Sequence, residues 1–161
     1  MVKRIGKIAS IALLAFGIAI ASCSLTQTSA PISQAALASK VTAFRSPTCG
    51  CCSLWVKHME EAGFQVEDRV TEDMAAVKAR YGVPDGLRSC HTAVIDGYVV
   101  EGHIPAADVA RLLTETPDVA GIAVPGMPIG SPGMESGNYV EPYTVFSFRQ
   151  DGTVAAFAEH S

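Results

Sequence analysis

One stretch of the chain decides the fold: residues 41–63, which read VTAFRSPTCGCCSLWVKHMEEAG. Its first four residues are β-formers, and the next four favour a turn. From Cys52 to Ala62 the apolar residues recur at helical spacing, and Gly63 follows as a helix C-cap would. The pattern predicts a strand, a loop and a helix, with the cysteines at the helix N-terminus.

The elements predicted downstream continue this alternation of strands and helices. They are a strand at 64–70, a helix at 73–81, strands at 92–95 and 98–101, and a helix at 105–114. The two later strands flank Asp96-Gly97, a turn dipeptide typical of a β-hairpin. The order β-α-β-α-β-β-α predicts an α/β protein of thioredoxin-like plan, in which helices flank a mixed sheet.

The C-terminal part of the chain departs from this plan. The segment from Gly121 to Asn138 is rich in Gly, Pro and Met, and we expect it to be irregular. Residues 143–148 and 153–157 flank Asp151-Gly152 and predict another hairpin. We expect this loop and hairpin to extend the thioredoxin-like plan as an appendage.

The N-terminal residues 1–22 have the features of a signal peptide. Three basic residues precede an uncharged run at 8–22, which is shorter than the roughly 20 residues that a membrane-spanning helix needs. The run ends in Ile20-Ala21-Ser22-Cys23, which resembles the lipobox of bacterial lipoproteins, so Cys23 is a candidate lipidation site. Cleavage after Ala30 or Ala38 would instead release a soluble protein. Both routes predict a periplasmic or otherwise extracytoplasmic protein, whose membrane contact is limited to a lipid anchor.

Length and composition bound the rest of the organisation. The 161 residues suffice for one modest domain, and we expect a flexible tether at 23–39 followed by the folded domain at 40–161. A hydrophobic content of 48% against 17% charged residues argues against a disordered chain. The net charge of −4 offers no basic surface for a nucleic acid, which excludes that class of partner.

The chemistry of the chain is concentrated in its cysteines. Cys49 and Cys52 have the C-x-x-C spacing of a redox dithiol, and Cys51 adds a sulfur beside them. A helix N-terminus stabilises thiolates, which favours reactive or metal-binding sulfur there. Structural disulfides are the alternative in an oxidising compartment, although neighbouring cysteines close strained rings.

Cys90 lies immediately before the strand predicted at 92–95. In a thioredoxin-like plan this loop faces the cysteines at the helix start, so Cys90 is expected to bring a fourth sulfur to them. His91 adjoins Cys90, yet strand alternation would point the two side chains to opposite faces. His103 is a further candidate ligand, with local hydrogen bonding at a helix start as the alternative.

Sulfur ligands also occur in the Gly/Pro-rich loop. Met127 and Met134 are weaker candidates, because a thioether can bind Cu(I) and, unlike a thiol, is not lost to disulfide formation. Shielding of the site by their loop is the alternative role. We expect His58 and His160 to be surface residues.

Thiolates and thioethers are soft ligands, which favour Cu(I) over hard cations. Zinc is the competitor, since four thiolates can form a closed tetrahedral site, but adjacent Cys51 and Cys52 fit poorly with the usual C-x₂-C knuckles. Bridging thiolates in a polynuclear Cu(I) cluster would tolerate such crowding. An iron–sulfur cluster is a weaker alternative.

Four motifs together resemble a family of small bacterial extracytoplasmic proteins catalogued as a domain of unknown function, whose named members are the CopG-type copper-resistance proteins. The motifs are Ser46-Pro47-Thr48-Cys49-Gly50-Cys51-Cys52, Ser89-Cys90-His91-Thr92, Val100-Glu101-Gly102-His103-Ile104-Pro105, and Gly126-Met127-Pro128-Ile129-Gly130-Ser131-Pro132-Gly133-Met134-Glu135. The resemblance runs from about residue 41 to residue 157. It implies a thioredoxin-like fold, copper binding by the clustered cysteines, and a redox role in handling Cu(I) and Cu(II).

Two functions follow from these patterns. The first is a copper-resistance protein that binds Cu(I) through Cys49, Cys51, Cys52 and Cys90 and couples thiol/disulfide change to copper redox, with copper export or delivery proteins as partners. The second is a metal-independent thiol-disulfide oxidoreductase that uses Cys49 and Cys52 on proteins. The additional sulfurs count against the second, because they would form competing disulfides. Turnover as a copper oxidoreductase is left open by the sequence.

Overall fold

The structure, a computed structural model, describes residues 34–161. The predicted signal peptide, the candidate lipidation site Cys23 and most of the predicted tether lie outside the described residues. Among the helices at 34–161, none has the length and apolar character needed to cross a membrane.

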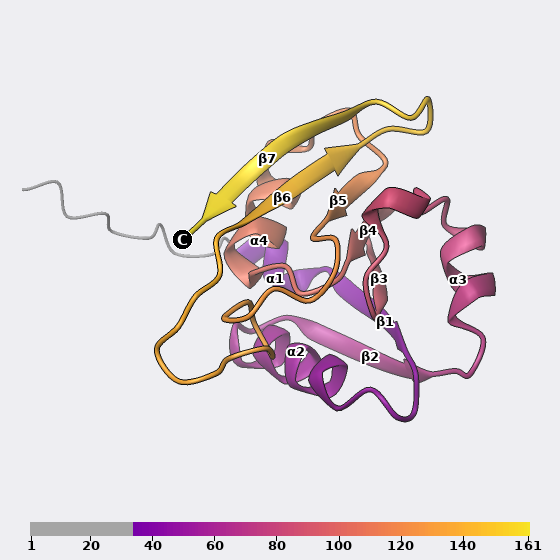
Figure 1. The fold of residues 1–161 in the computed structure, drawn as a ribbon. Coiled ribbons are helices and arrows are strands. Elements are labelled where there is room, and N and C mark those ends of the chain that lie inside the picture. The colour runs from indigo at the N-terminus through magenta and orange to yellow at the C-terminus, as the bar shows by residue number, and fades with distance from the viewer. Residues whose placement is uncertain (1–33) are drawn as a thin grey trace, which may run out of the picture. The chain divides into compact units, whose positions relative to one another are not determined.

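Helices and strands alternate through the first part of the described chain, and strands dominate its end (Figure 1). The helices are α1 (Gln34–Ala38), α2 (Gly50–Glu61), α3 (Met74–Arg80), the 3₁₀ turn η1 (Asp85–Leu87) and α4 (Ala106–Glu115). The strands are β1 (Lys40–Arg45), β2 (Gln65–Val70), β3 (Thr92–Ile95), β4 (Tyr98–Glu101), β5 (Gly121–Ala123), β6 (Tyr143–Phe148) and β7 (Val154–His160). Each helix and strand predicted from the sequence is present, with boundaries shifted by up to three residues.

Within residues 34–161 the strands form one mixed sheet of seven, in the order β2-β1-β3-β4-β5-β6-β7. Strand β1 pairs in parallel with β2 and antiparallel with β3, and β3 pairs antiparallel with β4. The parallel pair is connected through α2, and the antiparallel pair β3–β4 is the hairpin around Asp96-Gly97. This connectivity confirms the predicted thioredoxin-like α/β fold.

The C-terminal hairpin extends the thioredoxin-like plan as predicted, and it does so by adding strands to the same sheet. Strand β5 pairs in parallel with β4 and antiparallel with β6, and it joins the hairpin β6–β7 to the rest of the sheet. A Cβ on Gly121 would lie 2.1 Å from the carbonyl oxygen of Val99, so glycine permits the close approach of β5 to β4. A buried strand of three residues has too few positions to reveal a period, which is why the sequence predicted an irregular segment here.

Side chains on opposite faces of the sheet pack into different parts of the core. On one face, here called the α2 face, Val100 belongs to the cluster that includes Trp55 and Met59 of α2 and Leu112 of α4. On the other, here called the α3 face, the neighbouring Val99 packs with the Val83 and Leu87 region that follows α3. This alternation along β4 assigns each side chain near the cysteines to a face.

The short helix α1 lies in the segment predicted as a flexible tether. The tether prediction was therefore too long at its C-terminal end, because residues 34–38 are helical. Leu37 packs against the core cluster of the α2 face, and its side chain lies beside Gly63. A helix of five residues gives too weak a periodic signal to be identified from the sequence.

Candidate metal centre

Three cysteines lie at the N-terminus of α2, as predicted. Cys49 is the N-cap residue in extended conformation, and Cys51 and Cys52 fall in the first turn. Cys49 and Cys52 form a disulfide with a Cα–Cα distance of 5.4 Å. Cys52 is fully buried, and the Sγ atoms of Cys49 and Cys51 are 3.5 Å apart. One helical turn thus fixes the relative positions of these sulfurs.

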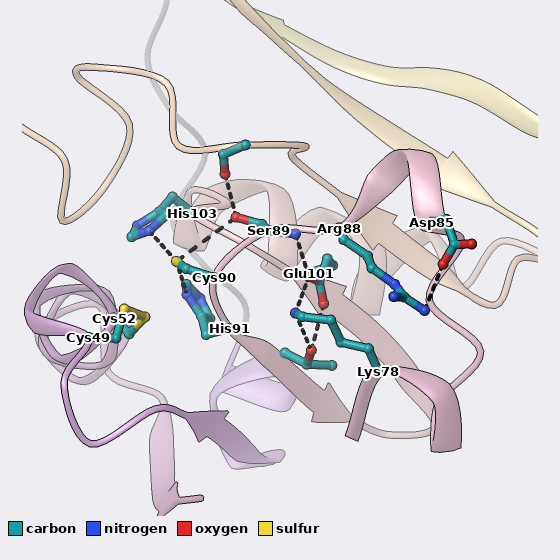
Figure 2. Close-up of polar contacts among 12 residues, drawn as sticks. Cys49, Cys52, Lys78, Asp85, Arg88, Ser89, Cys90, His91, Glu101 and His103 are labelled. Carbon is teal, nitrogen blue, oxygen red and sulfur yellow. Dashed lines mark hydrogen bonds and ion pairs between the residues drawn. A yellow bond between two sulfur atoms is a disulfide. The ribbon is translucent and has the colours of Figure 1, made fainter. Parts of the chain in front are cut away.

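The loop before β3 brings Cys90 to the same place. The sulfurs of Cys49, Cys51, Cys52 and Cys90 all lie within 4.8 Å of one another. Figure 2 shows the Cys49–Cys52 pair facing Cys90 across the gap between α2 and the β3 loop. The gathering of sulfurs that the sequence predicted is therefore present in the structure. Their binding of a metal stays a prediction.

His103 completes the far side of the cluster. It is fully buried, its Nε2 lies 3.0 Å from Cys90 Sγ, and its Nδ1 lies 2.8 Å from the carbonyl oxygen of Pro132. Since a carbonyl oxygen only accepts, Nδ1 carries the proton and the lone pair of a neutral His103 points from Nε2 toward Cys90. The expected position at a helix start was wrong, because α4 begins at Ala106.

His91 lies on the same side as Cys90, contrary to the expectation of opposite faces. Its Nδ1 is 3.4 Å from Cys90 Sγ, and its ring packs 4.4 Å from Trp55 and edge-on to His103. Strand alternation does not apply because Cys90 and His91 both precede β3, which begins at Thr92. Cys90, His91 and His103 form a further group whose ligand atoms lie within 4.8 Å of one another.

Burial controls the protonation of these side chains. Burial, together with the nearby Cys51, raises the pKa of the Cys90 thiol to about 12, so Cys90 is protonated at neutral pH when no metal is bound. Burial lowers the pKa of His91 well below its ordinary value, and the charges of His103 and Lys78 add to this effect. Burial likewise lowers the pKa of His103, against the opposing contributions of Pro132 and Glu135. Neutral imidazoles are the form that binds metals, whereas the thiol must lose its proton to do so.

His91 Nε2 is buried and has no hydrogen-bond partner among residues 34–161. An unpaired buried nitrogen costs free energy, which sets it apart from ordinary core histidines. The imidazole nitrogens beside the Cys90 sulfur are His91 Nδ1, at 3.4 Å, and His103 Nε2, at 3.0 Å, and these are the atoms that a metal ion near Cys90 could use.

The Gly/Pro-rich loop covers part of the cluster. A Cβ on Gly133, whose φ is +84°, would lie 2.8 Å from both the carbonyl oxygen of Cys51 and the amide nitrogen of Trp55. The loop therefore packs directly on the first turn of α2, in agreement with the expected shielding role. Met134 is half-buried and Met127 is 50% exposed. Both methionines remain predicted ligands of the weaker kind.

A buried polar network lies behind the Cys90 loop and was not anticipated from the sequence. Glu101 is fully buried and forms an ion pair with Lys78 of α3. It also accepts hydrogen bonds from the amide of Ser89 at 2.7 Å and from the hydroxyl of Thr92 at 2.6 Å. Burial raises the pKa of Glu101, and Lys78, Thr92 and Ser89 oppose that rise. A glutamate on a core-facing position of the predicted strand 98–101 was the signal available in the sequence.

The other histidines have structural partners, so the description of them as surface residues was incomplete. His58 Nε2 accepts the amide hydrogen of Ala106 at 3.1 Å and thereby caps α4, whose first residue is Ala106. His160 Nε2 lies 2.7 Å from Asp108 Oδ2, and its ring stacks on Tyr143. Both are partly buried.

The fold and the site together define a class: a thioredoxin-like protein with a cysteine cluster compatible with a metal site. Residues 87–134 match a family described as a protein of unknown function, DUF411. The chain is similar to a solved structure titled copper resistance protein copG, form 2, with 50% sequence identity and a TM-score of 0.73, over 76% of this chain and 98% of that one. A form 1 structure of the same title shows 50% identity and a TM-score of 0.72, over 75% of this chain and 96% of that one.

At this identity and coverage, the chain belongs to the CopG family of copper resistance proteins. The DUF411 match at residues 87–134 includes Cys90, His91 and His103, which form the far side of the cluster. No match was found among curated proteins.

Proposed function

We propose that this protein binds Cu(I) through Cys49, Cys51, Cys52 and Cys90 and couples thiol/disulfide change to the redox state of copper. The observation that carries the proposal is the approach of four sulfurs to within 4.8 Å of one another. Clustered thiolates select soft cations, and Cu(I) is the soft ion that a copper resistance protein would meet. The copper is cargo or substrate, and the protein supplies the ligands.

The redox step balances with the cysteines alone. Two Cu(II) ions each accept one electron from the thiols of Cys49 and Cys52, which lose two protons and form the disulfide. The products are two Cu(I) ions beside the remaining thiols of Cys51 and Cys90. These two residues are the cysteines outside a disulfide in the part of the chain that the structure describes.

The histidines give this site a second kind of ligand. His103 Nε2 directs its lone pair at Cys90, because Pro132 accepts the proton of Nδ1. His91 Nδ1 lies 3.4 Å from the same sulfur. Imidazole binds both oxidation states of copper, so these residues support a site that holds copper as it changes between them.

A metal-independent thiol-disulfide oxidoreductase is the second candidate. The disulfide at the N-terminus of α2, in a thioredoxin-like fold, favours it. Cys51 and Cys90 count against it, because each lies close enough to form a competing disulfide. Zinc is the second candidate metal, but adjacent Cys51 and Cys52 in one helical turn fit poorly with the regular tetrahedron that zinc prefers.

The proposal includes a periplasmic location, reached either with Cys23 as the lipidated first residue of the mature chain or by cleavage after Ala30 or Ala38. In that oxidising compartment the Cys49–Cys52 disulfide would persist until a reductant opens it. Copper ions are the first partner. Proteins that export or deliver copper are the expected exchange partners.

The decisive experiment is an anaerobic Cu(I) titration of the fully reduced protein, followed by metal analysis and thiol counting, with Cys90→Ser alongside. We expect the wild type to retain Cu(I) against a competing chelator and Cys90→Ser to retain it more weakly. Adding Cu(II) to the reduced protein should consume two thiols for each pair of copper ions reduced.

Two results would overturn the proposal. A wild-type protein that retains no copper but catalyses disulfide exchange would support the oxidoreductase. An unchanged copper stoichiometry and affinity in Cys90→Ser would show that the four-sulfur site does not operate. If the protein retains zinc rather than copper when the two ions compete, the site would be assigned to zinc.

A further inference from the structure

The Cys90 loop is held by one carboxylate at two points. Glu101 Oε1 accepts the amide hydrogen of Ser89 at 2.7 Å, and Glu101 Oε2 accepts the hydroxyl hydrogen of Thr92 at 2.6 Å. Cys90 and His91 are the residues between these attachment points. A single side chain on β4 therefore bridges the start and the end of the segment that carries them.

The bridge lies on the face of the sheet opposite to the cluster. Thr92 and Glu101 are directly paired across β3 and β4, and Glu101 alternates with Val100, which faces α2. Glu101 therefore points to the α3 face, where Lys78 of α3 meets it. His91 points to the α2 face and packs on Trp55. Figure 2 shows Lys78 and Glu101 on one side of the Cys90 loop and His91 on the other.

Lys78 compensates the negative charge of this buried carboxylate. The Lys78 side chain is 8% exposed, and its ammonium group donates to both Glu101 Oε1 and the hydroxyl of Thr92, the latter at 3.1 Å. A buried ion pair of this kind contributes little net stability, because desolvation of two charges offsets their attraction. Its directed hydrogen bonds, in contrast, define one position for the loop.

We propose that Lys78 and Glu101 are positioning residues that hold Cys90 at the distance from Cys51 and His103 that the copper site requires. The inference rests on the proposed function, since it concerns the same site. Neither side chain belongs to the clustered ligand groups. Their action passes through the backbone of Ser89 and the side chain of Thr92 to Cys90.

The test compares Glu101→Gln, Cys90→Ser and the double variant, in reduced protein titrated anaerobically with Cu(I) against a chromophoric chelator. The glutamine keeps the size of the side chain but presents one oxygen acceptor where the carboxylate presents two. We expect Glu101→Gln to lower Cu(I) affinity roughly 10- to 100-fold, as loss of a ligand's supporting hydrogen bonds typically does. Its ultraviolet Cu(I)–thiolate absorption should shift toward that of Cys90→Ser.

The double variant separates positioning from general destabilisation. If Glu101 acts through Cys90, Glu101→Gln should change affinity by less than about twofold once Cys90 is already serine. An equal loss in both backgrounds would overturn the inference, as would wild-type affinity and absorption in Glu101→Gln. Asp108→Asn is the matched control, because it also converts a buried, paired carboxylate to an amide, away from Ser89 and Thr92.

A copper-free measurement distinguishes failure of this inference from failure of the proposed function. Alkylation of Cys90, followed by peptide mass spectrometry, should be faster in Glu101→Gln than in the wild type, because the loop is released from the core. If wild-type protein binds no copper yet Cys90 is deprotected as expected, the proposed function fails and the positioning role survives. Unchanged alkylation overturns the positioning role. If Glu101→Gln does not fold, Lys78→Met, which removes the counter-ion, takes its place in each measurement.

Discussion

The two walls of the cysteine cluster are built in different ways. On the α2 wall, one helical turn holds Cys49, Cys51 and Cys52, and the spacing of adjacent residues sets their geometry. On the opposite wall, Cys90 and His103 come from separate loops and are held by long-range contacts to Glu101 and Pro132. The α2 wall should therefore tolerate changes elsewhere in the fold, whereas the opposite wall depends on its supports.

Trp55 joins the two walls, and its truncation should have the largest effect. The indole is fully buried, lies 4.4 Å from the ring of His91, and donates from Nε1 to the carbonyl oxygen of Ile104 at 2.9 Å. Trp55→Ala should lower the free energy of unfolding by about 3–5 kcal/mol, because it leaves a cavity and an unpaired carbonyl. Denaturant titration of the disulfide-intact protein measures this, with Trp55→Phe as the milder control. A loss below about 1 kcal/mol would mean that the walls are not joined through this residue.

Removal of the redox pair tests the α2 wall alone. Cys49→Ser/Cys52→Ser deletes two of the four sulfurs, so Cu(I) affinity should fall at least about 100-fold, beyond the range typical for losing a ligand's hydrogen-bond partner. Competition with a Cu(I) chelator measures the change. Ser53→Ala is the matched control, since it alters the same helical turn, where Ser53 donates to the carbonyl oxygen of Gly50, without removing sulfur. Wild-type affinity in the double variant would place the copper elsewhere.

The loop over α2 carries Pro132, which orients His103, so displacing this loop from the first turn of α2 should disturb the opposite wall. Gly133→Ala places a Cβ against Cys51 and Trp55 backbone atoms, and overpacking of this kind costs about 1–3 kcal/mol. Gly137→Ala is the control, because its φ is also positive, at +61°, but nothing lies within 4 Å of the added Cβ. The difference in the free energy of unfolding between these two variants measures the cost of the contact between the added Cβ at residue 133 and the α2 backbone. Formation of the Cys49–Cys52 disulfide should proceed normally in both; its loss in Gly133→Ala would contradict the independence of the walls.

The smallest effect concerns the cap of α4 by His58. Burial lowers the pKa of His58 below its ordinary value of 6.5, so the folded state favours the neutral ring that accepts the Ala106 amide hydrogen. The unfolded chain then binds more protons, and stability should decline as the pH falls below 6.5. Losing the cap altogether should cost about 1 kcal/mol. Unfolding at several pH values, with His58→Gln as a non-titrating acceptor, measures this; an equal pH slope in both proteins would assign the dependence to other groups.

The contrast between a wall set by adjacent residues and a wall held by long-range contacts also explains which features the sequence could predict. Local patterns identified α2 with its cysteines, the β3–β4 hairpin and the thioredoxin-like order of elements. Cys90 was predicted to join the cluster because the fold plan places its loop there. Interactions between distant residues left no comparable pattern: the Pro132 contact that orients His103, the Lys78–Glu101 pair, and the pairing of β5 that integrates the C-terminal hairpin.

The two edges of the sheet differ in how they would meet another strand. At one edge, β2 carries Glu67, Asp68 and Arg69 in succession, and these charges disfavour docking of a further strand. At the other, within the described residues, β7 pairs on one side with β6 and presents Ala155, Ala156, Phe157 and Ala158. Aggregation of concentrated protein would therefore begin at the β7 edge, and a lysine introduced there should improve solubility.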